Sequence, residues 1–239
     1  MTDLIIITGS NGGIGRELVD YYLGCQKRVI GIDTDNRLEH PDYRFIAVDL
    51  NDPAALQSMD FNAFDPGDYS VLINAAGIRE ITPLLELSLE TWLEVMQVNL
   101  TAPFVLSQKF CRTLLASGKQ GSIVNIASVS GMLGEPARTA YVSSKHGLLG
   151  LTKQFAVEFG RSGIRCNAIS PAITRTPMTE HYFSDEATLQ KINSGLYSTR
   201  TGQPADIASV VRLLAAQDSV FINGANFVVD GGWTCGKDL

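Results

Sequence analysis

The chain has 239 residues, of which 45% are hydrophobic and 18% are charged, and its formal net charge is −6 at pH 7. This composition suits a folded domain with a substantial core, and it argues against nucleic-acid binding, which needs a concentrated face of Lys and Arg. The first apolar run, at 4–7, is too short for a signal peptide or a membrane span, so we expect a cytoplasmic protein without a membrane partner. Four cysteines lie far apart without metal-site or disulfide spacing, so we expect buried free thiols and assign no metal: Cys25, Cys111, Cys166 and Cys235.

Short runs rich in Ile and Val alternate with longer amphipathic stretches along the chain. The short runs predict strands that are buried on both faces, at 4–8, 28–33, 44–49, 71–77, 122–128, 164–171 and 226–232. The longer stretches predict helices, among them 14–24, 88–100, 141–160 and 204–216. This alternation predicts one α/β domain over 1–239, a doubly wound parallel sheet with helices on both faces. Ligands of such sheets bind at the carboxyl ends of the strands.

A glycine-rich segment, TGSNGGIG at 8–15, joins the first predicted strand to the first predicted helix. Its glycines allow a tight turn and the close approach of a pyrophosphate to the helix N-terminus, although a turn without a ligand would explain them too. Asp33 ends the second predicted strand, eighteen residues after Gly15. An acidic side chain there accepts hydrogen bonds from a ribose diol and repels a 2′-phosphate. The glycine-rich segment and Asp33 together therefore predict NAD as the cofactor. The alternative is that Asp33 is a plain turn residue after a strand.

The order of motifs resembles that of the short-chain dehydrogenase/reductase family, in its short single-domain type. T-G-x-x-x-G-x-G is followed by NAAG at 74–77, VNL at 98–100, NIAS at 125–128, YVSSK at 141–145, SPAITRTPM at 170–178 and VDGG at 229–232. The resemblance covers nearly the whole chain and implies a Rossmann-like fold, a nicotinamide cofactor and an alcohol or ketone substrate. One departure is Ala172, which stands after Pro171 where the family usually has glycine.

The resemblance also implies which residues touch the cofactor. Asp49 and Leu50 would border the adenine, the NAAG segment would line the dinucleotide, and Thr176 would hold the nicotinamide carboxamide. The complete expected set is Gly9, Asn11, Gly13, Ile14, Gly15, Asp33, Asp49, Leu50, Asn74, Ala75, Gly77, Tyr141, Lys145, Pro171, Thr174 and Thr176.

Tyr141 and Lys145 are the candidate reactive pair. Residues four apart share one face of a helix, and a nearby cation lowers the pKa of a phenol from its ordinary value of about 10. A solvated Tyr/Lys pair on a helix surface is the alternative. Ser128 favours the catalytic role, because it ends a predicted strand thirteen residues before Tyr141, where the family places its serine. We therefore expect Tyr141 to exchange the hydroxyl proton while Ser128 holds the substrate oxygen.

Asn99 is the fourth candidate catalytic residue. It shares an apolar stripe with Trp92 and Met96 on its predicted helix, so we expect it to be partly buried and hydrogen-bonded. The alternative is that Asn99 is a hydrogen-bonded core residue with no catalytic role. The resemblance implies in addition that Asn99 holds a water that connects Lys145 to solvent.

The polar, weakly periodic segment 178–203 predicts a lid over the substrate. Arg79, Arg138 and Arg175 are close in sequence to predicted strand ends, and two of them together would suit an anionic substrate. We expect an NAD-dependent oxidoreductase of secondary alcohols and ketones. An NADPH-dependent ketoreductase of 3-oxoacyl chains on a carrier protein and a catalytically silent NAD(H)-binding protein are the alternatives.

Two predicted helical regions, 88–116 and 141–160, carry more apolar side chains than one side of a sheet readily covers. They include Leu89, Trp92, Val95, Met96, Phe104, Val105, Phe110 and Leu114 in the first, and Leu148, Leu149, Leu151, Phe155, Val157 and Phe159 in the second. One explanation is that all of these side chains belong to the core of the monomer. The resemblance implies that both regions pair with their copies across a two-fold axis, and it favours a homotetramer.

Overall fold

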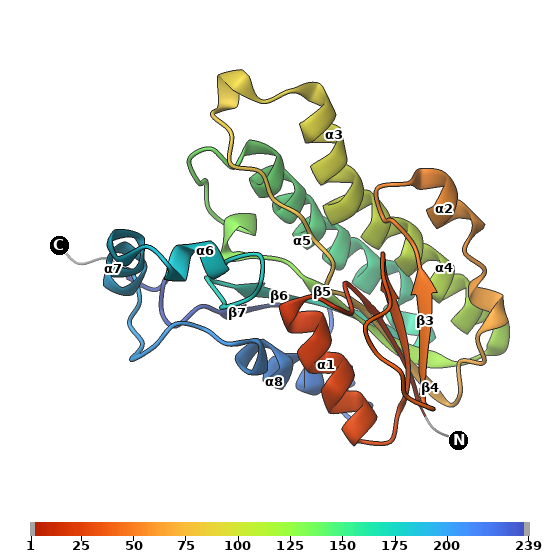
Figure 1. The fold of residues 1–239 in the computed structure, drawn as a ribbon. Helices are drawn as coiled ribbons and strands as arrows, with labels where there is room; N and C mark the ends of the chain where they lie inside the picture. Colours follow the sequence, from red (N-terminus) through yellow and green to blue (C-terminus); the bar gives the residue numbers. More distant parts are fainter. Residues whose placement is uncertain (1–2, 237–239) are drawn as a thin grey trace.

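A computed structural model describes residues 3–236 of the chain, and its centre is one seven-stranded parallel sheet. The strand order is β3-β2-β1-β4-β5-β6-β7, so the chain starts in the interior of the sheet and builds outward in both directions (Figure 1). The strands are β1 (Leu4–Thr8), β2 (Arg28–Asp33), β3 (Tyr43–Ala47), β4 (Tyr69–Asn74), β5 (Gln120–Ile126), β6 (Ile164–Pro171) and β7 (Asn226–Val229). The predicted doubly wound sheet is confirmed.

Helices cover both faces of this sheet (Figure 1). One face carries α1 (Gly13–Gly24) and α8 (Pro204–Ala215). The other carries α3 (Leu89–Met96), α4 (Ala102–Ser117) and α5 (Thr139–Phe159), with α2 (Pro53–Ser58) beside α4. Two short helices, α6 (Glu180–Phe183) and α7 (Glu186–Ser194), lie in the segment predicted to be a lid.

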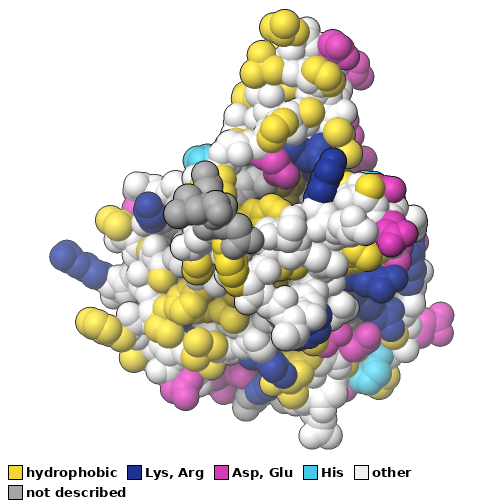
Figure 2. Space-filling view, turned by 90° about the vertical axis from the view of Figure 1, so that its left-hand side faces the viewer, with side chains coloured by type: hydrophobic (Ala, Val, Ile, Leu, Met, Phe, Trp, Pro, Cys, Tyr) yellow, Lys and Arg dark blue, Asp and Glu magenta, His cyan; other side chains and the backbone are white. Residues whose placement is uncertain are grey.

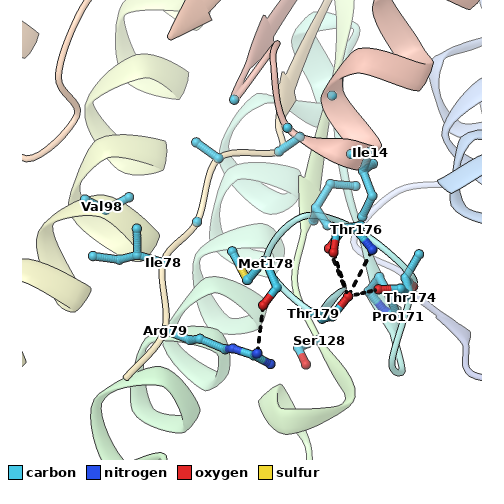
Figure 3. A pocket seen from close by; sticks show the side chains of 18 of the residues that line it. Ile14, Ile78, Arg79, Val98, Ser128, Pro171, Thr174, Thr176, Met178 and Thr179 are labelled. Atoms are coloured by element: carbon cyan, nitrogen blue, oxygen red, sulfur yellow. Dashed lines mark hydrogen bonds between the residues drawn. The ribbon is translucent and has the colours of Figure 1, made fainter. Parts of the chain in front are cut away.

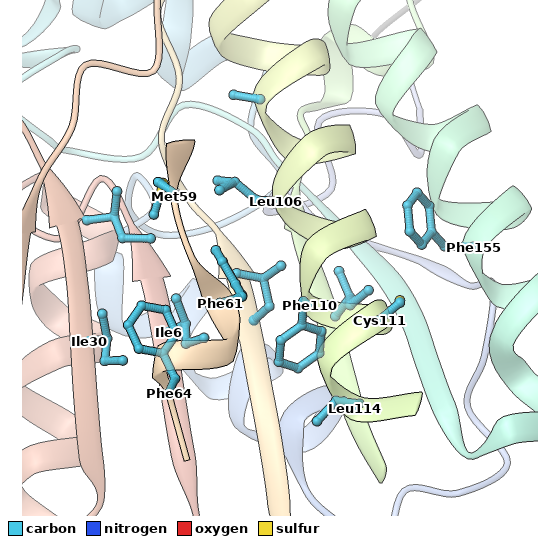
Figure 4. Close-up of a cluster of buried hydrophobic side chains, with 14 of the residues drawn as sticks. Ile6, Ile30, Met59, Phe61, Phe64, Leu106, Phe110, Cys111, Leu114 and Phe155 are labelled. Atoms are coloured by element: carbon cyan, nitrogen blue, oxygen red, sulfur yellow. The ribbon is translucent and has the colours of Figure 1, made fainter. Parts of the chain in front are cut away.

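The continuous apolar strands supply a core on each face. In β1, Leu4 and Ile6 join the cluster under α4 and α5, whereas Ile5 and Ile7 join the cluster under α1 and α8. This alternation follows from the two-residue period of a strand, and a central parallel strand therefore needs apolar residues at every position. Figure 4 shows the first cluster, where Phe110 of α4 packs toward the strands.

The predicted helix 88–100 is wrong as a single element. A π-helical turn, Gln97–Thr101, separates α3 from α4 and contains Asn99. Pro103 has no N–H group to bond the carbonyl of Asn99, so the regular helical ladder is interrupted at this point.

Several boundaries and two cysteines also differ from the predictions. The third strand ends at Ala47, so Asp49 lies beyond it. The fourth strand ends at Asn74 and the fifth at Ile126, so the motif residues that follow them leave the sheet and lie at its carboxyl edge. The last strand ends at Val229, and left-handed glycines follow it. Cys111 and Cys166 are buried free thiols as expected, whereas Cys25 and Cys235 are exposed.

Candidate active site

A cavity of about 690 Å³ runs along the carboxyl ends of the central strands. The glycine-rich turn and Asp33 line one end, and Ser128, Tyr141 and Lys145 line the other. Its wall is completed by the chain that follows β6, where Thr174, Thr176, Met178 and Thr179 lie near the side chains of Arg79 and Ser128 (Figure 3). The predicted cofactor and reactive ends therefore share one cavity.

The glycine-rich turn brings backbone close to backbone. Gly9 has a φ of 66°, and a Cβ on Gly15 would lie 2.0 Å from the Gly9 carbonyl oxygen. A Cβ on Gly13 would lie 2.7 Å from Thr176 Cγ2. No side chain caps the N-terminus of α1, and its first residues line the cavity. The residues present thus fit a pyrophosphate, because amides without intrahelical partners and the helix dipole both favour an anion there.

Asp33 is held at the cavity edge by two backbone amides. Its Oδ2 accepts a hydrogen bond from Asn11 N, and its Oδ1 accepts one from Thr34 N, each at 2.9 Å. Arg37 also lines the cavity, but its Nε donates to Asp35 Oδ2 at 2.7 Å. Asp33 thus places an acceptor at this end of the cavity, and Arg37, which also lines it, is paired with Asp35.

Most of the predicted cofactor residues line the cavity, and Asn74 does not. Its Nδ2 donates to Asn125 Oδ1 at 2.8 Å, and the side chain lies 2% exposed in a polar cluster beneath α4. Ala75 is the neighbour that faces the cavity. Thr8, whose role the sequence did not reveal, fixes this turn by accepting hydrogen bonds from Ala75 N and Ala76 N at 3.1 Å.

Ser128, Tyr141 and Lys145 come together from two elements. Ser128 lies just beyond β5, while Tyr141 and Lys145 lie on one face of α5 near its N-terminus. Lys145 Nζ lies 5.6 Å from the centroid of the Tyr141 ring and donates to Ile126 O at 2.8 Å. The lysine is only 4% exposed, and burial lowers its pKa to about 8.

Burial raises the pKa of the Tyr141 phenol above its ordinary value, the Ser128 hydroxyl and Arg79 lower it, and Glu135 raises it. Arg138 lowers it as well, and the expected effect of Lys145 on the phenol stays a prediction. The Lys145 ammonium is directed to the Ile126 carbonyl, and burial lowers its pKa.

Asn99 is more deeply buried than predicted and does not line the cavity. Its Oδ1 accepts from Ile78 N at 2.9 Å, while its Nδ2 donates to Ile78 O at 2.8 Å and to Ser144 Oγ at 3.1 Å. A Cβ on Gly77 would lie 3.4 Å from Asn99 Oδ1 and 3.5 Å from Lys145 Nζ. Asn99 is therefore a satisfied core amide close to the lysine, and the water relay stays a prediction.

Glu80 is a functional residue that the sequence did not reveal. Its buried carboxylate accepts hydrogen bonds from Ala140 N at 2.7 Å and from Tyr141 N at 3.1 Å, so it caps the helix that carries the phenol. Arg138 donates to the Glu80 backbone carbonyl at 3.0 Å. Glu80 and Ala140 are 60 residues apart, so no local sequence pattern predicts this contact.

Two of the three candidate anion-binding arginines contact Tyr182, in the segment predicted to be a lid. The Arg79 guanidinium carbon lies 4.7 Å from the Tyr182 ring centroid, and Arg138 donates to the Tyr182 hydroxyl at 2.6 Å. Both arginines line the cavity. Arg175 instead pairs with Glu180 at 2.8 Å on the surface and does not line it.

Two classes of site are not found within residues 3–236. No group of three or more His, Cys, Asp or Glu side chains there could hold a metal ion. No helix in that range is long and apolar enough to cross a membrane.

Comparison with known proteins agrees with this geometry. The family model described as enoyl-(acyl carrier protein) reductase matches residues 11–234. The (3R)-3-hydroxyacyl-CoA dehydrogenase of Rattus norvegicus is 34% identical over 250 residues, which cover 96% of this chain and 95% of the relative.

Solved structures are similar over almost the full length. 4-Hydroxyisoleucine dehydrogenase complexed with NADH has a TM-score of 0.93 and 44% identity, covering 99% of this chain and 100% of that one. The complex of 4-hydroxyisoleucine dehydrogenase with NADH and succinate has a TM-score of 0.88 and 43% identity, covering 97% of this chain and 100% of that one. A gluconate 5-dehydrogenase from Burkholderia cenocepacia J2315 with NADP and tartrate has a TM-score of 0.88 and 26% identity, covering 98% of this chain and 96% of that one.

The resemblance inferred from the motifs is therefore confirmed by sequence and by structure. The glycine turn, the acidic end of β2 and the shared cavity fit a nicotinamide dinucleotide, NAD or NADP. The chain belongs to the short-chain dehydrogenase/reductase family and is an oxidoreductase that acts on CH–OH groups.

Proposed function

We propose that this protein oxidises the secondary alcohol of a small carboxylic acid with NAD, and that it reduces the corresponding ketone in the reverse direction. The observation that carries the proposal is one cavity in which Arg79 and Arg138 lie beside Ser128 and Tyr141. The nicotinamide ring supplies hydride chemistry when the dinucleotide is bound. The protein's own groups supply binding, orientation and proton transfer.

Tyr141 takes the hydroxyl proton of the alcohol, and Ser128 donates a hydrogen bond to the same oxygen in the ketone direction. Lys145, with a pKa of about 8, is able to exchange a proton near neutral pH on the buried side of the phenol. Glu80 fixes the first turn of α5 and thereby the position of the Tyr141 side chain. Asn99 acts as a positioning residue, because its amide holds the backbone of Ile78, next to Gly77.

A carboxylate on the substrate is supported by the two arginines and by the relatives. Guanidinium groups bind carboxylates through paired, charge-assisted hydrogen bonds. The 4-hydroxyisoleucine dehydrogenase complex contains succinate, and the gluconate 5-dehydrogenase complex contains tartrate. We infer that Arg79 and Arg138 exchange part of their contact with Tyr182 for the substrate carboxylate, with 178–203 as the lid.

The test of this function is an oxidation assay with three substrates and both cofactors. We expect NAD-dependent oxidation of 4-hydroxyisoleucine, and a kcat/KM at least tenfold lower for its carboxamide, which lacks the charge that the arginines bind. Faster NADPH-dependent reduction of a 3-oxoacyl thioester would favour the ketoreductase alternative. Absence of any turnover with intact cofactor binding would favour the catalytically silent one.

Asp33 is expected to select NAD over NADP. Replacing Asp33 by Ala removes an acceptor for the ribose diol and a charge that repels a 2′-phosphate, so NADH binding weakens and NADPH binding improves. We expect the ratio of the two dissociation constants to change by at least tenfold. Fluorescence titration of both reduced cofactors measures it. A wild-type protein that binds NADPH more tightly than NADH would contradict the assignment.

We further propose a homotetramer. Val95, Phe110, Leu114, Leu148 and Phe155 prove to be monomer core, contrary to the wider surface expected from the sequence. Other apolar residues remain exposed on the projection at the top of Figure 2, on the adjoining helices and near the last strand: Leu84, Leu85, Leu89, Leu93, Phe104, Val157, Val220 and Phe221. These surfaces support two separate pairing axes.

Light scattering on dilute, active protein is expected to give the mass of four chains, because two pairing axes together close a tetramer. A monomeric mass would contradict any oligomer, and a dimeric mass would leave only one axis.

The four free thiols also support the cytoplasmic location expected from the sequence.

A further inference from the structure

The substrate end of the cavity contains one acidic side chain that the reaction does not use. Glu135 lines the cavity with Ser128 and Tyr141, in the loop that joins β5 to α5. Its Oε2 accepts a hydrogen bond from Ser130 Oγ at 2.7 Å. In the part of the chain that the structure describes, no ion pair joins Glu135 to a basic side chain. The carboxylate is thus available to a cation in the cavity.

The Glu135 carboxylate lies close to the Ser128 hydroxyl. Ser128 Oγ donates to Ser130 Oγ at 3.2 Å, and Ser130 Oγ donates onward to Glu135, so Ser128 and Glu135 are separated by at most the sum of these two lengths. The charge of Glu135 also reaches the Tyr141 phenol, whose pKa it raises. A substrate whose oxygen is held by Ser128 and Tyr141 therefore places its neighbouring carbons within reach of Glu135.

Charges of both signs surround this part of the cavity. Arg79 and Arg138 supply positive charge, Glu135 supplies negative charge, and the buried Lys145 is directed to the Ile126 carbonyl. Asp33, Asp35 and Asp49 line the cavity as well, but they belong to the cofactor end, as does Arg37. A simple carboxylic acid would satisfy the arginines, whereas Glu135, which is exposed at the cavity edge, would face no cationic group of the substrate.

We propose that Glu135 binds the ammonium group of the substrate, so that the preferred substrate is an α-amino acid whose side chain carries the secondary alcohol. This inference rests on the proposed function and names its substrate class. In a γ-hydroxy-α-amino acid the oxygen and the nitrogen are on carbons separated by one carbon, a spacing that matches the short path from Ser128 through Ser130 to Glu135. The ammonium donates to Glu135 and to Ser130 Oγ, while the α-carboxylate faces Arg79 and Arg138.

The experiment compares 4-hydroxyisoleucine with 4-hydroxy-3-methylpentanoate, which is the same molecule without the amino group. The wild-type protein is expected to have a kcat/KM at least tenfold higher for the amino acid. Glu135→Gln keeps the shape and one acceptor oxygen for Ser130 but removes the charge, so we expect it to reduce that ratio by about tenfold. Glu17→Gln, at an exposed position on α1 outside the cavity, is the matched control and should keep the wild-type ratio.

A second variant separates ammonium binding from an effect on Ser128. If Glu135 acts only by orienting Ser130 and Ser128, then Glu135→Gln and Ser130→Ala lower kcat/KM equally for both substrates and leave their ratio unchanged. That result would overturn the proposal. A change in the ratio that appears in Glu135→Gln, with an unchanged melting temperature, supports it.

Binding measurements keep the proposal testable without turnover. If the wild-type protein oxidises neither compound, the proposed function fails, and the same pair is titrated calorimetrically into the protein–NADH complex. Tighter binding of the amino acid to the wild type, lost in Glu135→Gln, would still assign the ammonium site. Equal affinities of the wild type for the two compounds would overturn it.

Discussion

Replacing Tyr141 by Phe is expected to lower kcat by about 10²- to 10⁴-fold, because the variant lacks the group that exchanges the hydroxyl proton. Only one oxygen atom is removed, and the ring keeps its place beside Lys145. The melting temperature and the affinity for NADH should therefore stay close to those of the wild type. Steady-state oxidation of 4-hydroxyisoleucine and fluorescence titration of NADH measure the two properties.

Tyr21→Phe is the matched control for this substitution. Tyr21 lies on α1, outside the cavity, so loss of its hydroxyl should leave kcat unchanged. A Tyr141→Phe protein with near-normal turnover would contradict the role of the phenol. Loss of turnover together with loss of folding would also contradict it, because the proposal predicts a folded protein that binds cofactor.

Gly15→Ala is expected to raise the dissociation constant of NADH by at least tenfold. The added Cβ would lie 2.0 Å from the Gly9 carbonyl oxygen, a backbone atom, so the turn must open and the first amides of α1 must move from the pyrophosphate. Calorimetric titration of NADH measures the loss. Unchanged affinity would show that this turn does not hold the dinucleotide.

Gly24→Ala provides the control for an added methyl group in the same helix. No atom lies within 4 Å of a Cβ at Gly24, the last residue of α1. Alanine is the better helix former, so the variant should bind NADH normally and melt at the same temperature or a few degrees higher. The pair Gly15→Ala and Gly24→Ala thus separates the cofactor turn from helix stability.

The candidate residues that the structure brings to the cavity come from patterns that are local in the chain. The glycines before α1 and the Tyr141/Lys145 pair are local patterns whose geometry follows from a turn and from a helical period. Ser128 could be placed because it ends a buried run and because the family motif has a fixed spacing. The same reasoning predicted the order of strands and helices, since apolar period and turn residues are local too.

The parts that it missed depend on contacts between distant segments. Asn74 faces the core because the direction of a side chain after a strand depends on where that strand ends, which periodicity does not fix. Glu80 caps a helix 60 residues away, and Tyr182 meets two arginines from separate segments. The pKa shift of Tyr141 depends on burial and on groups that only the folded chain brings together.

The most direct test of the central claim is the fate of the hydrogen on the alcohol carbon. The wild-type protein is given NAD and 4-hydroxyisoleucine that carries deuterium at the carbinol carbon, and the reduced cofactor is examined by mass spectrometry after one turnover. We expect NADH that contains one deuterium, formed by the wild type and not at a comparable rate by Tyr141→Phe. Formation of no NADH, or of NADH without deuterium, would contradict it.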